Sequence, residues 1–404
     1  MERNLLPGLQ PGAINSAAVP EKARQELANT IRVCHIVSGD LWAGAEVQAG
    51  SLLRALASRP GLSLSVILLN QGRLAEEVGA CGLELKVIPE NAKGFIQIFR
   101  EAARFLRPRN IQILHSHRYK ENLLAVLLAR TCHIPHIVRT QHGLPEPFQG
   151  KKHIRQRLMS GLDRFLARHA TDRVISVSPE LREHLVKYTD PAKVVVIPNG
   201  LDVNHVSSAL SRTEARERLG IPADAPTIGY AGRLEPIKRL DLFLAAAQLV
   251  ARQVPNAKFL LVGDGSEASR LREMARASSL HDSVMFLGHR NDIYDVLRAL
   301  DVFLLCSDHE GLPMVLLEAL HLGVSVVARQ VGGLGDVIQD GVSGVLVRSS
   351  DPKVLAAQCV HLLVDAKRRR DMASAGRARV SEFFSADRNA TQVAALYREL
   401  CQGM

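Results

Sequence analysis

The alternation of short apolar segments with helical patterns constrains this chain more than any other feature of its sequence. In the first half, the strand-like segments span 32–38, 64–69, 85–88, 111–114 and 173–178. In the second half, they span 227–231, 258–262, 284–288, 301–306 and 344–347. Short apolar runs that are each followed by a helix are typical of buried parallel strands. The sequence therefore predicts an α/β fold with two doubly wound sheets.

A polar stretch at 201–225 separates the two alternating halves. We therefore expect an N-terminal Rossmann-like domain over 31–205 and a C-terminal one over 206–385, sizes that suit a chain of 404 residues. Residues 1–30 contain three prolines and no continuous apolar core, so we expect a flexible extension and not a signal peptide. No apolar run is long enough for a transmembrane helix.

The stretch 301–323, DVFLLCSDHEGLPMVLLEALHLG, predicts a strand, a polar loop and a buried helix. We expect Pro313 at the first helical position, which proline tolerates. The backbone N–H groups of Gly311, Leu312 and the residues after Pro313 would then meet at one place, where an anion can bind.

Two glutamates belong to this stretch. Glu318 falls in the middle of the apolar helix, where a buried carboxylate needs hydrogen-bond donors such as the two hydroxyls of a ribose. Glu310 on the preceding loop can hold a second polyol. The alternative is an ordinary solvated Glu310 and a Glu318 paired with a neighbouring arginine.

Two cations, Arg233 and Lys238, lie on one predicted strand-to-helix loop. Arginine can bind a diphosphate through two parallel hydrogen bonds and lysine can act as a point charge, so both can serve one diphosphate. The alternative is a solvated loop with two unrelated cations.

Histidines mark the ends of two predicted strands in the first half: His115 and His117 after one, and His142 after the next. Ligands gather at the carboxyl ends of the strands in open α/β sheets. We expect His142 to be functional and His115 to be structural, and leave both roles open for His117.

These motifs together resemble those of the retaining glycosyltransferases of family 4 (GT4). Glu310 and Glu318, with seven residues between them, resemble the E-x7-E motif, and Arg233 and Lys238 resemble the donor-phosphate pair. His142-Gly143 resembles the H-G pair that faces the donor sugar. The other matching positions are His117 of an H-x-H motif, Gly263 of a G-D/E-G turn, Gly288 at a strand end near the base, and Gly44 of a G-G-x-E loop in which Ala43 replaces the first glycine.

The resemblance implies the GT-B fold, in which two Rossmann-like domains face each other across a cleft and a last helix, here 386–402, returns to the first domain. It implies transfer of a sugar from a nucleotide-diphosphate sugar with retention and without a metal or other cofactor. Arg233, Lys238, Gly311 and Leu312 would bind the departing diphosphate. Glu318 would bind the ribose, Glu310 and His142 the sugar, and Gly44 and His117 the loop or acceptor side.

Charge and composition indicate the partners. Residues 1–200 hold 27 Lys and Arg against 17 Asp and Glu, whereas the rest of the chain holds 24 of each. A basic half favours an anionic partner, such as a glycan or lipid-linked acceptor or a membrane surface. The basic amphipathic pattern over 151–172 suits contact with such a surface, and the simpler alternative is a helix that packs on the core and has a solvated basic face. One Trp and five Tyr provide no platform for nucleic acid.

The scattered cysteines form no metal-binding pattern and favour the cytoplasm, with the enzyme peripheral on the inner face of the membrane as a further expectation. Two other functions stay open at this point. A sugar-nucleotide epimerase of similar fold would use the same donor site, and a scaffold subunit of a polysaccharide assembly complex would keep the fold without catalysis.

Overall fold

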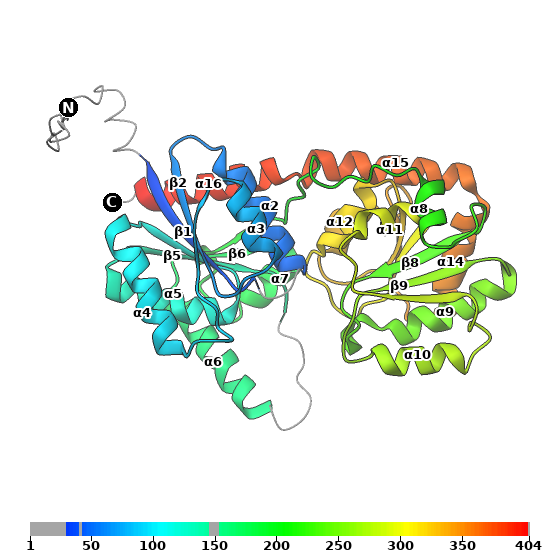
Figure 1. Ribbon diagram of the computed structural model, residues 1–404, viewed down its shortest axis with the longest axis horizontal. Coiled ribbons are helices and arrows are strands. Elements are labelled where there is room, and N and C mark those ends of the chain that lie inside the picture. The colour runs from blue at the N-terminus through cyan, green and yellow to red at the C-terminus, as the bar shows by residue number, and fades with distance from the viewer. Residues whose placement is uncertain (1–29, 40–42, 145–152, 403–404) are drawn as a thin grey trace, which may run out of the picture.

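The computed structural model describes residues 30–39, 43–144 and 153–402. The predicted extension over 1–30 lies outside this range except for Thr30. Figure 1 shows two α/β halves beside each other, with the helices α15 (Ala366–Phe383) and α16 (Ala386–Gln402) running along one side from the second half to the first. The prediction of two doubly wound parallel sheets is confirmed.

The first sheet has seven parallel strands in the order β3-β2-β1-β4-β5-β6-β7. Its strands are β1 (Ile31–Val37), β2 (Leu62–Leu68), β3 (Glu84–Val87), β4 (Ile113–Ser116), β5 (His136–Gln141), β6 (Arg173–Ser176) and β7 (Val194–Val196). The helices of this half are α2 (Gly44–Ala57), α3 (Arg73–Ala80), α4 (Phe95–Leu106), α5 (Tyr119–Cys132), α6 (His153–His169) and α7 (Pro179–Leu185). Central strands such as β1 are buried on both faces, which explains their nearly continuous apolar sequence.

The second sheet has six parallel strands in the order β10-β9-β8-β11-β12-β13. Its strands are β8 (Thr227–Ala231), β9 (Lys258–Val262), β10 (Val284–Gly288), β11 (Val302–Leu305), β12 (Ser325–Arg329) and β13 (Val345–Val347). The helices are α8 (Arg212–Arg218), α9 (Leu240–Gln253), α10 (Ala268–Arg276), α11 (Ile293–Ala299), α12 (Met314–His321), α13 (Leu334–Val337) and α14 (Pro352–Val364). In both sheets the strand order reverses beside the first strand, which is where such folds bind ligands.

The chain crosses between the halves twice, at neighbouring points. Leu201 pairs with Ser385, and Asn389 donates a hydrogen bond to the Pro198 carbonyl at 2.6 Å. α16 then packs on α2 and β1, and Tyr397 is completely buried in that contact. α15 was not predicted, because its polar sequence lacks a continuous apolar stripe. The domain boundaries at 205 and 385 remain a proposal.

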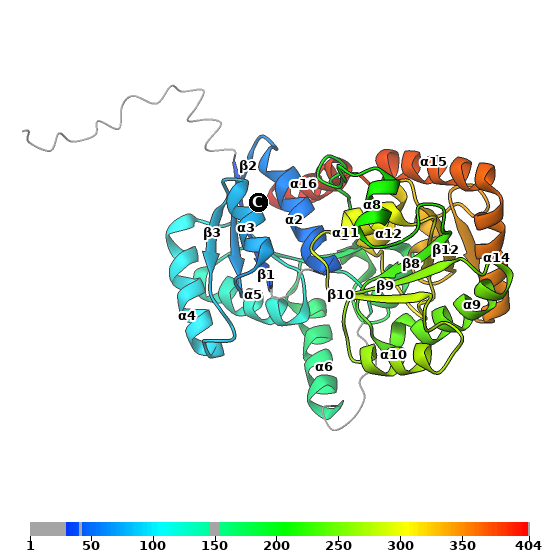
Figure 2. The ribbon, with the colours of Figure 1, turned by 45° about the vertical axis from the view of Figure 1, so that its right-hand side comes forward.

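Helices α12 and α2 bring the two halves into contact. Figure 2 places α12 of the second half beside α2 of the first, and their residues are in contact. Among the residues that the structure describes, no helix is both long and apolar enough to cross a membrane.

Candidate functional site

Three glycines align at the carboxyl ends of neighbouring strands in the second sheet. Gly263 follows β9 with a φ of +121°, and a Cβ there would lie 2.0 Å from the Gly232 carbonyl oxygen after β8. Gly263 donates its N–H to the carbonyl of Gly288, the last residue of β10, at 2.7 Å. A side chain at Gly263 would separate these loops, so glycine is required for their close approach.

An ion pair joins the loops that follow β8 and β11. Lys238 ends the short 3₁₀ helix η3 (Pro236–Lys238), and its Nζ lies 2.9 and 2.8 Å from the two carboxylate oxygens of Glu310. Ser307 donates a third hydrogen bond to Glu310 at 2.6 Å. The Glu310 side chain is only 7% exposed, so these donors replace the water that its carboxylate has lost. The ordinary solvated Glu310 considered from the sequence is therefore wrong.

Arg233 lies on the same loop as Lys238, with an exposed side chain. Its carbonyl accepts a hydrogen bond from the buried Tyr230 hydroxyl at 3.1 Å. The charges of Glu310 and Arg233 act on the pKa of Tyr230 in opposite directions, although burial is the main cause of its strong rise. Both charges are therefore near the Tyr230 hydroxyl, and the loop holds Arg233 and Lys238 on one side of the second sheet.

The residues before α12 contact the first half of the chain. A Cβ on Gly311 would lie 2.1 Å from the His142 carbonyl oxygen, so the two loops touch through their backbones. Asn199 donates a hydrogen bond to the Leu312 carbonyl at 2.7 Å across the same boundary. Pro313 is the N-cap of α12 with an extended ψ of 128°, so the expectation of Pro313 at the first helical position is wrong by one residue. Proline adopts both conformations at a φ near −70°, and sequence does not distinguish them.

Glu318 is buried within α12, as predicted. Burial raises the pKa of Glu318 to about 7, and the positive charge of Arg73 on α3 acts in the opposite direction. Burial is the main cause that raises the pKa of Tyr294 on α11, and the charge of Glu318 adds to it, so the carboxyl lies near groups from both halves. A group with this pKa changes between acceptor-only and donor forms near neutral pH.

Three buried histidines, His35, His115 and His117, and the partly buried His142 lie in or just after strands of the first sheet and form a continuous chain of hydrogen bonds. His142 Nε2 lies 3.4 Å from His117 Nδ1, and His117 Nε2 lies 3.1 Å from His35 Nδ1. The Tyr397 hydroxyl joins His35 Nε2, at 3.1 Å, to His115 Nδ1, at 2.5 Å. Burial is the main cause that lowers the pKa of His35, His115, His117 and His142, that of His117 to about 3, so all four rings are neutral at pH 7. The structural role expected for His115 fits this position.

Three of these histidines also have the spacing of a metal site. His35, His115 and His117 each offer a ring nitrogen, and these atoms lie within 4.8 Å of one another. However, the His115 and His117 rings are stacked, with centroids 4.6 Å apart and planes inclined by 15°. A metal ion lies in the plane of each imidazole that binds it, so these two rings cannot share an ion without reorientation. The arrangement suits a hydrogen-bonded chain better than a metal centre.

Gly44 begins α2, and a Cβ there would meet no atom within 4 Å. It is exposed, so neither packing nor backbone strain explains a glycine at this position. The loop before it, from Asp40 to Trp42, lies outside the described residues.

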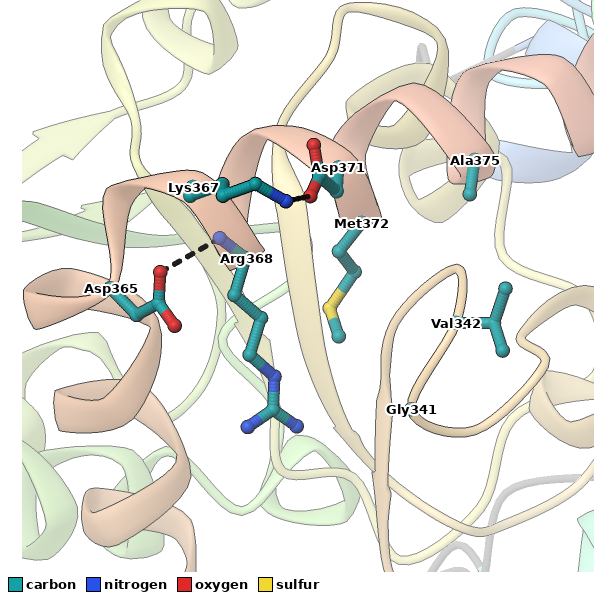
Figure 3. A pocket seen from close by; sticks show the side chains of 8 residues that line it. All are labelled: Gly341, Val342, Asp365, Lys367, Arg368, Asp371, Met372 and Ala375. Atoms are coloured by element: carbon teal, nitrogen blue, oxygen red, sulfur yellow. Dashed lines mark hydrogen bonds and ion pairs between the residues drawn. The ribbon is translucent and has the colours of Figure 1, made fainter.

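Figure 3 shows the residues around a hollow of about 340 Å³ at the start of α15, and none of them belongs to the predicted site. It is lined by Gly341, Val342, Asp365, Lys367, Arg368, Asp371, Met372 and Ala375.

Sequence reasoning missed four residues of this region: His35, Tyr397, Ser307 and Asn199. Tyr397 and Asn199 reach the site from distant segments, which no local motif reveals. His35 did carry a signal, because a histidine within the apolar strand RVCHIV needs hydrogen-bond partners.

Comparison with known proteins gives concordant matches for both halves. The model of the family described as Glycosyltransferase Family 4 matches residues 42–205, and that of Glycosyl transferases group 1 matches residues 211–379. The chain is 30% identical over 268 residues to a UDP-Gal:alpha-D-GlcNAc-diphosphoundecaprenol alpha-1,3-galactosyltransferase of Escherichia coli, covering 65% of this chain and 68% of that protein. It is 31% identical over 350 residues to a D-inositol 3-phosphate glycosyltransferase of Geodermatophilus obscurus, covering 80% and 74%.

Solved structures match the fold over nearly the whole chain. Anabaena HepE in complex with UDP and glucose superposes with a TM-score of 0.80 at 20% identity, covering 91% of this chain and 100% of that one. WaaG, a glycosyltransferase involved in lipopolysaccharide biosynthesis, gives a TM-score of 0.70 at 16% identity, covering 90% and 99%. At these identities the likeness concerns the fold, and it confirms the predicted GT-B arrangement.

Proposed function

Because this chain belongs to the group 1, family 4 glycosyltransferases, it is a glycosyltransferase of glycan biosynthesis, and we propose that it moves a sugar from a nucleoside diphosphate sugar with retention of anomeric configuration. The observation that carries the proposal is the Lys238–Glu310 pair beside the start of α12. It brings a cation, a carboxylate and a helix N-terminus together where a diphosphate and a sugar can bind side by side.

In this proposal, Arg233, Lys238 and the N–H groups from Gly311 onward stabilise the charge that develops on the departing diphosphate. Such preorganised donors supply the electrostatic stabilisation that a metal ion supplies elsewhere, so the reaction needs no metal. A donor phosphate oxygen takes the acceptor proton, as the family resemblance implies, and no protein base is needed.

The remaining site residues hold the donor. Glu318 accepts hydrogen bonds from the ribose diol, because its buried carboxylate lacks the solvation that those hydroxyls would restore. Glu310 and His142 hold hydroxyls of the sugar. Gly263 and Gly288 allow the base to approach the backbone at the ends of β9 and β10. Gly44 faces the acceptor side, whereas the buried His117 supports His142 through the hydrogen bond between their rings.

We propose a lipid-linked or cell-surface glycan as acceptor. The Escherichia coli relative is named for a diphosphoundecaprenol-linked sugar, which is anionic and lies at a membrane. α6 projects from the first half in Figures 1 and 2. Its described part exposes Leu162 and Phe165 beside Arg164 and Arg168, a combination suited to an anionic membrane surface. The enzyme would act at the inner face of the cytoplasmic membrane.

The epimerase and scaffold alternatives are not favoured, since the relatives that match about two thirds or more of this chain are named as transferases. Donor binding tests the proposal directly. Thermal stability is measured with UDP, GDP and ADP and with their sugars, in EDTA, starting with UDP because the relative is named for UDP-Gal. A ligand at 100 times its Kd should add about 2.7 kcal/mol of stability.

The variant for this test is Lys238→Ala. Lys258→Ala is the matched control, because the Lys258 ammonium donates to the Asp282 carbonyl at the start of β9, away from the proposed donor site. Stabilisation of the parent and the control by one nucleotide, but not of Lys238→Ala, supports the donor site. No stabilisation of any of the three proteins would contradict it. NMR of the product then reports the anomeric configuration.

A further inference from the structure

The hydrogen-bonded histidine chain, which runs from His142 through His117, His35 and Tyr397 to His115, has only two consistent proton arrangements. Each neutral imidazole carries one N–H donor and one acceptor nitrogen, so the choice at one ring fixes the next. If the Tyr397 hydroxyl donates to His35, then His35, His117 and His142 all carry their protons on Nδ1. If it donates to His115 instead, all of them carry their protons on Nε2. The free nitrogen of His142 is a donor in the first case and an acceptor in the second.

The distances around Tyr397 favour the second arrangement. A hydroxyl donor makes a shorter hydrogen bond than an N–H donor. The Tyr397 oxygen lies 2.5 Å from His115 Nδ1 but 3.1 Å from His35 Nε2, so its proton points at His115 and its lone pair accepts from His35. His115 Nε2 then donates to Thr140 Oγ1, which lies 2.7 Å away. Imidazole also intrinsically prefers its proton on Nε2, so no ring in this arrangement is in its less stable tautomer.

The choice between the two proton arrangements matters at His142, the last ring of the histidine chain. His142 Nδ1 is buried and has no hydrogen-bond partner among the described residues. The backbone carbonyl of His142 touches Gly311, the residue after Glu310. The unpartnered Nδ1 of His142 therefore lies beside the proposed sugar site. Buried polar atoms without a partner are rare in folded proteins, and a ligand group is a common explanation.

We infer that Tyr397, through His35 and His117, fixes His142 in the Nε2–H tautomer, so that its Nδ1 accepts a hydrogen bond from a hydroxyl of the sugar. The inference deepens the proposed function and rests on it for the identity of that hydroxyl. Tyr397, His35 and His117 are positioning residues, and His142 contacts the substrate. The C-terminal helix α16 thereby takes part in the site although it is far from it in sequence.

The test is the tautomer of His142 by two-bond 1H–15N correlation on protein labelled with 15N-histidine, with His142→Gln identifying the signals. The parent should show a protonated Nε2 and an unprotonated Nδ1. In Tyr397→Phe, His35 loses the acceptor for its Nε2 proton, so the three rings should shift towards the Nδ1–H form. Loss of the acceptor nitrogen that holds the sugar hydroxyl should then lower kcat/KM about tenfold.

The control is Tyr188→Phe, since Tyr188 belongs to the same half but is outside the histidine chain. In this variant, the 15N signals of His142 and the kcat/KM of transfer should equal those of the parent. A parent with the proton on Nδ1, or a Tyr397→Phe spectrum unchanged at His142, would overturn the inference. The tautomer is measured without substrate, so failure of sugar transfer in the parent would contradict the proposed function and leave this result readable.

Discussion

Lys238 Nζ contacts both carboxylate oxygens of Glu310, at 2.9 and 2.8 Å, across two loops that are 72 residues apart in sequence. The pair connects the ends of β8 and β11, which are neighbours in the second sheet. In the free protein each side chain therefore holds the other in place. A donor that arrives with two phosphates and a sugar would meet a cation and a carboxylate that are already oriented.

Lys238→Ala should impair both stability and activity. It leaves Glu310 buried with Ser307 as its remaining side-chain partner among the residues that the structure describes, at a cost of about 1–3 kcal/mol. Loss of one charge-stabilising group should lower kcat by about 10²–10³. Denaturant unfolding and initial rates measure the two effects.

The double variant Lys238→Ala/Glu310→Gln separates the effect of losing Lys238 on stability from its effect on activity. It removes the unpaired charge, so it should recover part of the lost stability without recovering activity. Recovery of both would indicate that the pair is only structural.

Gly311→Ala and Gly44→Ala should give opposite results. A Cβ at Gly311 would lie 2.1 Å from the His142 carbonyl oxygen and must push the two halves apart, at a cost of about 1–3 kcal/mol. A Cβ at Gly44 meets nothing within 4 Å and lies in a helix, so stability should be unchanged or rise by up to about 1 kcal/mol. If the loop contacts a ligand, as we propose, Gly44→Ala should still raise KM. Melting temperatures and KM values for both variants check this, and an unchanged KM would exclude the loop contact.

The sequence predicted the two parallel sheets and the positions of Glu310 and Glu318 because these depend on local patterns. Strand alternation, a polar loop and an apolar helix are all encoded within about 20 residues. The contacts between distant segments could not be predicted from the sequence. Nothing local shows that Tyr397 reaches His35, or that Asn199 bonds to the Leu312 carbonyl, because such contacts depend on how the two crossings at 201 and 385 bring the halves together.

The surface of α6 is a second feature that depends on contacts between distant segments and not on local sequence. Its apolar stripe included Leu162, Phe165 and Leu166, and packing into the core was the simpler interpretation. In the structure Leu166 is buried, whereas Leu162 and Phe165 are 39% and 59% exposed. The periodicity predicted the helix but not which part of the stripe would be covered.

Phe165→Glu should weaken binding to anionic vesicles, because it removes exposed apolar area and adds a charge of the same sign as the lipids. Sedimentation with vesicles of phosphatidylglycerol and phosphatidylcholine measures the bound fraction. Val364→Glu, at an apolar side chain that is 74% exposed at the end of α14, is the control and should bind as the parent does. Equal loss in both variants, or in neither, would argue against α6 as the contact.

Glu318 should make both stability and donor affinity depend on pH. Its pKa of about 7 in the folded protein exceeds the ordinary value of 4.5, so the folded state holds its proton more tightly. Its contribution is fully present below pH 4.5 and is lost as the pH rises through 7, a change of about 3 kcal/mol. Glu318→Gln should remove this part of the pH dependence of stability, so the variant should gain stability relative to the parent at pH 8 and not at pH 4.5.

Donor affinity should change with pH in the opposite direction, because the ribose hydroxyls bind the ionised carboxylate of Glu318. Binding to the parent should therefore strengthen as the pH rises to about 7, and below that pH it should release a proton. Calorimetry in buffers of different ionisation enthalpy measures that proton, and a Glu318→Gln protein with the parent's affinity and proton release would show that Glu318 does not bind the ribose.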